Sequence, residues 1–173
     1  MFTILKKIGQ YGPLILLLTS IFLLRNKSNL LFYYVLFFGI SIILNIVLKG
    51  LIQQSRPCIE PKIFQMMMKN KERYINKHGI PYDIFGMPSG HSQSVLFSTI
   101  FIYFSLRDFK ILLFYVVVSL ITLCQRVIDN HHSVMQVIVG SSIGIVLGYV
   151  AYVIAKSNIE GKKTAKKDDY GPL

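Results

Sequence analysis

Charged residues are scarce in this sequence: Asp, Glu, Lys and Arg together make up 16% of its 173 residues. An average soluble domain has roughly 25%. Hydrophobic residues make up 53% of the chain, and its mean hydropathy is +0.51. This composition excludes an ordinary soluble domain. It indicates a membrane protein, with a chain long enough for one domain.

Cysteines and carboxylates are also few. Cys58 and Cys124 belong to no Cys-x-x-Cys pair and to no Cys/His spacing typical of zinc sites. We therefore expect two free thiols. Glu60, Glu72 and Asp83 are scattered along the chain and form no cluster for a divalent cation. The sequence accordingly predicts neither a metal nor a cofactor.

Basic residues outnumber acidic ones by 19 to 8, so the formal net charge is +11. The positive charge lies mostly between apolar runs, as it does in the loops of membrane proteins. We therefore expect membrane lipid and a phosphorylated substrate as partners, and no nucleic acid.

Five apolar runs are long enough to cross a bilayer as helices. The sequence thus predicts an all-α, polytopic membrane bundle. Arg25-Asn26-Lys27 follows the first run where a signal peptide would have small residues, so that run is interpreted as a retained helix. The runs cover residues 8–24, 30–48, 92–106, 109–124 and 134–155.

The domain organisation follows from these runs. Residues 1–155 are expected to form one transmembrane domain, and residues 156–173 a basic, polar and disordered tail. In the last run, Gly140, Gly144 and Gly148 are spaced for close helix packing, although glycine is common in membrane helices in general.

The one long connection spans residues 49–90. Its middle, residues 61–77, mixes apolar residues with Lys and Arg. The pattern favours an amphipathic helix in the membrane interface. A solvated loop is the alternative.

Three polar clusters lie at the ends of the apolar runs. In the first, Lys49 closes the second run and Arg56-Pro57 follows. A helix continuing through Gln54 would place Lys49 and Arg56 two turns apart on one face. A flanking lysine is common at any membrane helix, so Lys49 alone would indicate little.

In the second cluster, Ser89 and Gly90 precede the third run and His91 begins its first turn. The N–H groups at a helix N-terminus lack partners and can bind an anion. An ordinary serine N-cap is the alternative interpretation.

In the third cluster, Arg126 ends the fourth run, and His132 opens the fifth with Gln136 one turn further on. A short polar turn is the alternative. The second and fourth runs are separated by two crossings, so all three clusters lie on one side of the membrane. Three cations, backbone donors and two histidines together are typical of a phosphate site with a nucleophile and an acid.

The clusters resemble the type 2 phosphatidic acid phosphatase superfamily, whose soluble relatives include the vanadium haloperoxidases. Its signature is Lys-x6-Arg-Pro, then Pro-Ser-Gly-His, then Ser-Arg-x5-His-x3-Asp. The first two parts are complete in this chain, and Arg126 and His132 match the third. Two residues depart from the pattern: Gln125 replaces Ser, and Gln136 replaces Asp.

The resemblance implies a metal-independent lipid phosphatase. His132 would be the nucleophile, His91 the general acid and base, and Gln136 the residue that orients His132. The phosphate-binding groups would be Lys49, Arg56, Ser89, Gly90 and Arg126. His131 is a rival nucleophile, and Asp129 a rival orienting group.

The substrate can also be inferred from the resemblance. Gln136 and the stretches Arg-Pro-Cys and Gly-Met-Pro-Ser-Gly-His-Ser-Gln are similar to the dolichyl diphosphatase branch. We therefore expect hydrolysis of a polyprenyl, dolichyl-type diphosphate to the monophosphate through a phospho-histidine. The alternatives are a phosphatidate or general lipid phosphate phosphatase, an inactive lipid-phosphate-binding protein, and transfer of phosphate to an acceptor other than water.

The same resemblance implies the location. A eukaryotic or viral chain of this kind is expected in the endoplasmic reticulum membrane, and a bacterial one in the plasma membrane. The lysine-rich tail favours the cytoplasm. The active site is then expected on the lumenal or extracytoplasmic side.

Overall fold

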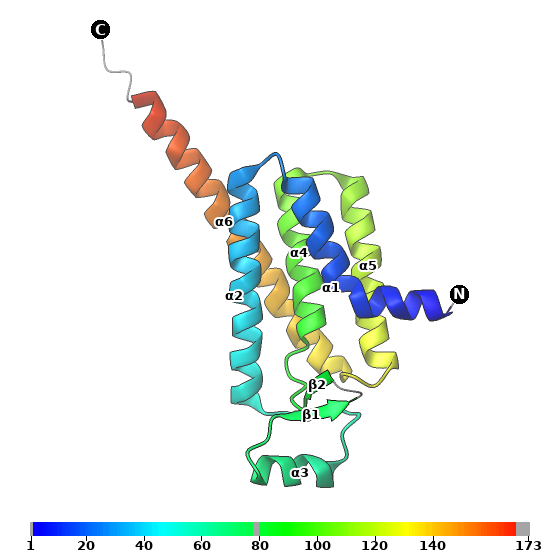
Figure 1. Cartoon of the computed structure of the whole chain (residues 1–173). Helices are drawn as coiled ribbons and strands as arrows, with labels where there is room; N and C mark the ends of the chain where they lie inside the picture. The colour runs from blue at the N-terminus through cyan, green and yellow to red at the C-terminus, as the bar shows by residue number, and fades with distance from the viewer. Residues whose placement is uncertain (1, 78–79, 169–173) are drawn as a thin grey trace.

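A computed structural model describes residues 2–77 and 80–168. In that part of the chain, five long helices form an elongated bundle around the central α4 (Figure 1). The all-α bundle expected from the sequence is confirmed. The helices are α1 (Phe2–Leu24), α2 (Ser28–Ile52), α4 (Gly90–Leu106), α5 (Phe109–Ile128) and α6 (Val134–Asp168).

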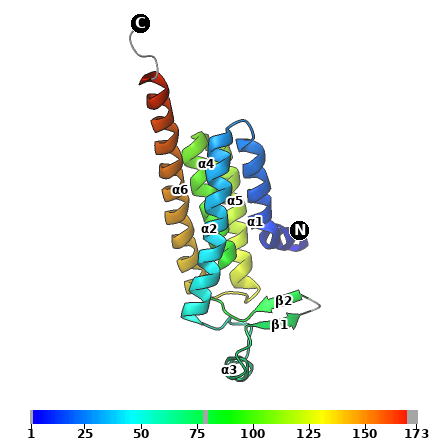
Figure 2. The same cartoon turned by 60° about the vertical axis from the view of Figure 1, so that its left-hand side comes forward.

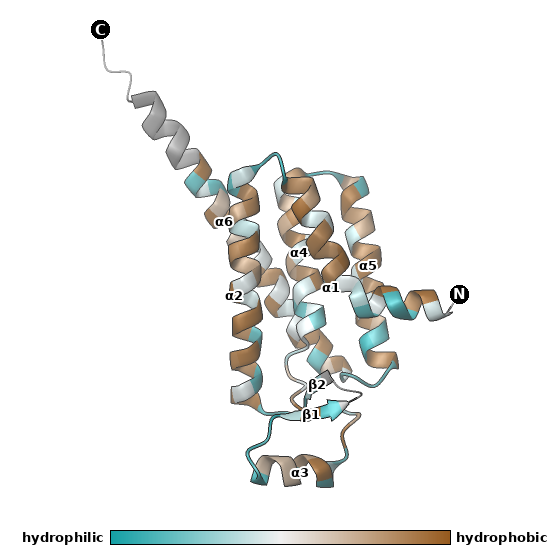
Figure 3. Ribbon diagram, in the orientation of Figure 1, coloured by the Kyte–Doolittle hydropathy of each residue, from teal (hydrophilic) through white to brown (hydrophobic). Residues whose placement is uncertain are grey.

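The outer faces of the bundle are strongly apolar (Figure 3). Phe22, Ile43 and Val146 are each at least 60% exposed. A surface of this kind is stable in lipid and not in water. Within the described residues, α1, α2, α5 and α6 are long and apolar enough to cross a membrane. The 17-residue α4 is about 26 Å long and runs between them. The chain is thus a multi-pass membrane protein.

Polar side chains join the helices inside the bundle. The Tyr34 hydroxyl is 2.8 Å from Ser98 Oγ, and Thr99 Oγ1 is 2.9 Å from Ser119 Oγ. In lipid, where helices lack a hydrophobic drive to associate, such hydrogen bonds help to hold them together.

The glycine stripe of α6 lies directly against α4. A Cβ atom at Gly144 would collide with the carbonyl oxygen of Gln93, and one at Gly148 would lie 2.6 Å from that of Phe97. Gly140 meets the backbone of Ser89 in the same way. The spacing therefore serves close packing, because any larger residue would push the two helices apart.

Helices α1 and α6 differ from expectation. The N-terminal part of α1 turns away from the bundle (Figures 1 and 2), and Pro13 inside this helix removes one backbone hydrogen bond and favours the bend. Residues 156–168, expected to be disordered, continue α6 beyond the other helices. Extending an existing helix avoids the cost of nucleation. The domain boundary after residue 155 stays a prediction.

The long connection forms a cap at one end of the bundle (Figure 2). It contains α3 (Pro61–Lys69) and the antiparallel strands β1 (Tyr74–Lys77) and β2 (Ile80–Asp83). The helix expected within residues 61–77 is present over Pro61–Lys69, but its expected extension to residue 77 is wrong, because β1 follows. Met67 of α3 is 2% exposed and packs in one cluster with Ile84 and Phe85. These contacts hold the cap in place.

The topology predicts that α1 begins on the capped side of the membrane and α6 ends on the other. Single cysteines at Thr3, Lys71 and Thr164, in a background with Cys58 and Cys124 replaced by serine, test this. An impermeant thiol reagent should label Thr3→Cys and Lys71→Cys from one side and Thr164→Cys from the other. Labelling of all three from one side would contradict the five crossings.

Candidate active site

His132 is buried in the site and hydrogen-bonded through both ring nitrogens. It lies in the turn before α6, so it does not share a helical face with Gln136 as expected, and it is 3% exposed. Its Nδ1 is 2.9 Å from Gly86 O and 3.2 Å from Gln136 Oε1. Both oxygens accept, so Nδ1 carries the proton. The lone pair is left on Nε2, which is 3.0 Å from Arg56 Nη1.

The surroundings of His132 keep its ring neutral. Burial, followed by the positive charges of Arg56 and Lys49 and then that of Arg126, lowers its pKa to about 2, although the hydrogen bond to Gln136 acts to raise it. A neutral ring with a lone pair on Nε2 is the form that can act as a nucleophile.

Arg56 connects the loop after α2 to two other segments, β2 and the turn before α6. Its Nε donates to Asp83 O at 2.7 Å and its Nη1 to His131 O at 3.4 Å, and the guanidinium lies 4.5 Å from the centre of the Tyr82 ring. The helical continuation through Gln54 that would place Lys49 and Arg56 on one face does not occur. Helix α2 ends at Ile52, and the left-handed residue that follows turns the chain.

Lys49 is 7% exposed at the end of α2. Its Nζ donates to Phe85 O at 3.2 Å and lies 3.5 Å from Asp83 Oδ2. Arg73 Nη2 is 3.1 Å from the same carboxylate oxygen. Asp83 therefore neutralises part of the positive charge of the site. In the sequence it was only one of several scattered carboxylates.

The Asp83 carboxylate is kept ionised by its partners. Burial acts to raise its pKa, but the hydrogen bonds from Arg73 and from Phe85 N–H, with the charge of Lys49, outweigh burial and lower it. Asp83 thus stays an anion that ties the cap to α2.

The start of α4 offers fewer donors than expected. Ser89 N–H donates to Gln136 O at 3.0 Å, and Ser89 Oγ accepts from Ser92 Oγ at 2.9 Å. Within the described residues, the N–H groups of Gly90 and His91 have no hydrogen-bond partner. An anion at this helix end would therefore meet Gly90 and His91 rather than the amide of Ser89.

A series of polar contacts links Arg126 to Lys6 in α1. Its Nε donates to Gln125 Oε1 at 2.6 Å, Gln125 donates in turn to Asp129, and Asp129 lies 3.2 Å from Lys6 Nζ. The Arg126 carbonyl accepts from His132 N–H at 3.0 Å. Asp129 thus pairs with Gln125 and Lys6, whereas Gln136 contacts His132.

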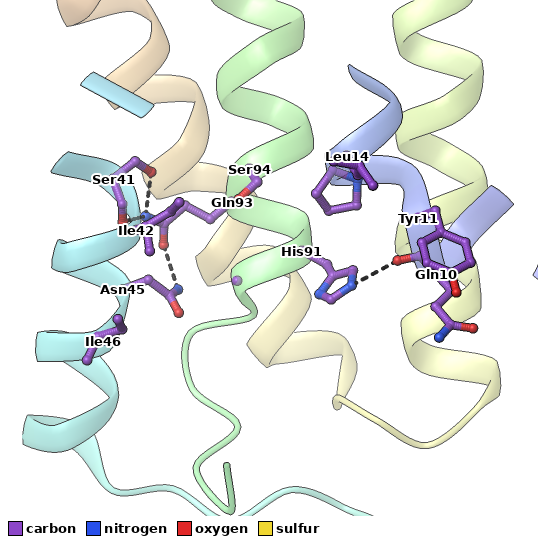
Figure 4. Close-up of a pocket in the computed structure, with 12 residues that line it drawn as sticks. Gln10, Tyr11, Leu14, Ser41, Ile42, Asn45, Ile46, His91, Gln93 and Ser94 are labelled. Carbon is purple, nitrogen blue, oxygen red and sulfur yellow. Dashed lines mark hydrogen bonds between the residues drawn. The ribbon is translucent and has the colours of Figure 1, made fainter. Parts of the chain in front are cut away.

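His91 faces a separate pocket. Its Nε2 lies 3.2 Å from the carbonyl oxygen of Gln10 in α1 (Figure 4). In the described part of the chain, no hydrogen bond joins its ring to the other predicted site residues. The pocket has a volume of about 310 Å³ between α1, α2 and α4, with Leu14, Ile42 and Ile46 among its walls. His91 and Gly90 are where this apolar pocket meets the polar site.

Three residues near the site were not predicted from the sequence: Tyr82, Asp83 and Gln54, whose side chain contacts Gln136. The apolar and aromatic residues on either side of Gly79 could have predicted the hairpin that contains Tyr82 and Asp83. No sequence pattern marked Gln54. Tyr82 OH lies 3.0 Å from His131 Nδ1.

Over residues 2–77 and 80–168, no group of three or more His, Cys, Asp or Glu could hold a metal ion.

Comparison with known proteins supports the family inferred from the motifs. The model of the PAP2 superfamily, the type 2 phosphatidic acid phosphatases, matches residues 30–160. Searches among curated proteins and among solved structures gave no match. The matched region contains every predicted site residue from Lys49 to Gln136. The members of the PAP2 superfamily are phosphatases and phosphoesterases. With most of its length matched, this membrane chain belongs to the PAP2 superfamily.

Proposed function

We propose that this protein hydrolyses a polyprenyl, dolichyl-type diphosphate to the monophosphate. The observation that carries the proposal is the pairing of His132 with Arg56. The Nε2 lone pair lies 3.0 Å from a guanidinium nitrogen, while Nδ1 is held by two oxygen acceptors. This arrangement suits a nucleophile that lies next to Arg56, the residue proposed to bind the phosphate group of the substrate.

In the proposed reaction, His132 Nε2 attacks the terminal phosphorus in line. A P–N bond forms, and the P–O bond to the polyprenyl phosphate breaks. Lys49, Arg56, Arg126 and the Gly90 amide stabilise negative charge on the equatorial oxygens. The cations supply the charge that Mg²⁺ provides in other phosphoryl transfers.

His91 exchanges the proton in both steps. The Gln10 carbonyl accepts from Nε2, so the protonated ring gives its Nδ1 proton to the departing oxygen and is left neutral. In the second step His91 takes a proton from water, whose oxygen attacks the phospho-histidine. The P–N bond breaks and inorganic phosphate leaves.

We infer that the lipid part of the substrate lies beside His91. The apolar pocket of about 310 Å³ there, between α1, α2 and α4, suits the apolar chain of either a polyprenyl or a diacylglycerol lipid. The polyprenyl lipid is favoured by Gln136, which stands where the dolichyl diphosphatase branch also has Gln. A general lipid phosphate phosphatase is the second candidate, because its site would use the same cations.

Membrane location is part of the proposal. The site lies on the capped side, opposite the basic end of α6. Because positive charge favours the cytoplasm, the site faces the lumen or the outside of the cell. The membrane is that of the endoplasmic reticulum in a eukaryotic or viral setting, and the plasma membrane in a bacterial one.

The test is a substrate panel in detergent with excess EDTA. Polyprenyl diphosphate, polyprenyl monophosphate and phosphatidate are compared with the purified protein, with a His132→Asn variant as control. We expect the highest kcat/KM for the diphosphate and no loss with EDTA. A preference for phosphatidate would favour the general phosphatase. Activity that EDTA abolishes and Mg²⁺ restores would contradict the metal-independent mechanism.

A further inference from the structure

The side-chain amide of Gln136 is held at both ends. Its Oε1 accepts from His132 Nδ1 and from Ser133 N–H, each at 3.2 Å. Its Nε2 donates to Gln54 Oε1 at 3.0 Å and to Ser55 O at 2.9 Å. All four positions around this 2%-exposed side chain are therefore occupied.

Backbone groups decide which end of the amide is which. Ser133 N–H can only donate, so the end that faces it is the oxygen. The carbonyl of Ser55 can only accept, so the end that faces it is the NH2 group. The orientation of Gln136 is thus determined independently of His132. It presents an acceptor to Nδ1 beside the Gly86 carbonyl, and the two oxygens together keep the proton on Nδ1 and the lone pair on Nε2.

Close packing leaves this amide little room to move. A Cβ atom at Gly86 would lie 2.5 Å from Gln136 Oε1. Gly86 N–H also donates to the Gln54 carbonyl at 2.7 Å. The loop after α2 and the segment before α4 are therefore joined directly where they enclose Gln136.

A carboxylate at position 136 would not be accommodated in the same way. One of its oxygens would face the Ser55 carbonyl, which can only accept, and the Gln54 side chain, which would have to turn its NH2 group around to donate. An anion buried against an acceptor is strongly unfavourable. The site is thus built for a neutral amide where the family pattern has Asp.

We propose that Gln54 is a positioning residue of the phosphatase reaction, which accepts from Gln136 Nε2 and, together with the neighbouring backbone groups, holds the amide oxygen in place at His132. Gln54 acts through Gln136 and touches neither His132 nor, in the proposed mechanism, the phosphate. The inference rests on the proposed function for its kinetic effect. The tautomer of His132, however, can be measured without turnover.

The first test changes the acceptor on Gln54. Gln54→Leu removes it, while Gln54→Glu keeps an oxygen facing Gln136. We expect Gln54→Leu to lower kcat about three- to thirtyfold with KM nearly unchanged, as one lost positioning hydrogen bond predicts. Gln54→Glu should retain most of the activity, as should the control Gln65→Leu on the exposed face of α3.

The second test reverses the polarity of the pair. Gln136→Glu places a carboxylate beside His132 and should lower kcat about a hundredfold. The negative charge also favours the protonated ring, which raises the pKa of His132 and moves the acid limb of kcat/KM to higher pH. The charged groups that face this pair are Arg56, Lys49 with its partner Asp83, and Arg126. Adding Gln54→Lys supplies a donor and should recover about tenfold.

¹⁵N chemical shifts of the His132 ring report its tautomer directly. We expect the Nδ1–H form in all three proteins, since the Gly86 carbonyl still accepts, and a changed Nδ1 shift in Gln54→Leu alone, where the contact with Gln136 is loosened. An unchanged Nδ1 shift and an unchanged kcat in Gln54→Leu would overturn the inference. A parent with the expected tautomer but no phosphatase activity would overturn the proposed function and leave the positioning contact supported.

Discussion

Replacing His132 with asparagine is expected to abolish turnover, with a loss of at least about ten-thousandfold in kcat. The Asn side-chain amide can still donate toward Gly86 O, as Nδ1 of the histidine does. It has no counterpart of the Nε2 lone pair. The variant therefore tests the nucleophile with little change to the packing around it.

A covalent intermediate gives a second readout for this variant. Substrate labelled with ³²P in the terminal phosphate, quenched during turnover, should leave an acid-labile label on the parent and none on His132→Asn. His131→Asn is the matched control, since His131 is adjacent but contacts Tyr82. Loss of the label in His131→Asn alone would identify His131 as the nucleophile and refute the assignment to His132.

Replacing Arg56 with lysine is expected to lower kcat/KM by about a hundred- to a thousandfold, although the charge is retained. The guanidinium donates to Asp83 O and His131 O at once, while another of its contacts is His132 Nε2. A single ammonium group cannot span these positions. The change would thus remove the anchor that holds the cation against the nucleophile.

Arg107→Lys is the matched control for this prediction, because Arg107 follows α4 at the opposite end of the bundle from the cap. Its kcat/KM should equal that of the parent. Melting temperatures in detergent separate the loss of a catalytic cation from loss of the fold. An Arg56→Lys enzyme with parental kcat/KM would show that position 56 needs only a charge.

Much of the architecture could be predicted because membrane insertion depends on local composition. An apolar run of sufficient length crosses the bilayer wherever it lies in the chain. Counting crossings from Lys49 to Arg126 then predicts that both lie at the same membrane surface, and in the structure the ends of α2 and α5 lie at the same, capped end of the bundle. The helical extent of residues 70–77 and 156–168 was mispredicted, since marginal segments respond to their neighbours more than to composition.

The sequence by itself determined the bundle, the family and the residue types that meet at the capped end. Only the tertiary structure decided what each of them does there. In the structure, the Ser89 N–H donates to the Gln136 carbonyl, Lys49 pairs with Asp83, and the His91 ring faces α1. The tertiary structure also brings Gln54 to Gln136 across 82 positions of chain. These outcomes depend on hydrogen-bond geometry between distant segments, which local pattern does not encode, because a shift of one ångström exchanges one partner for another.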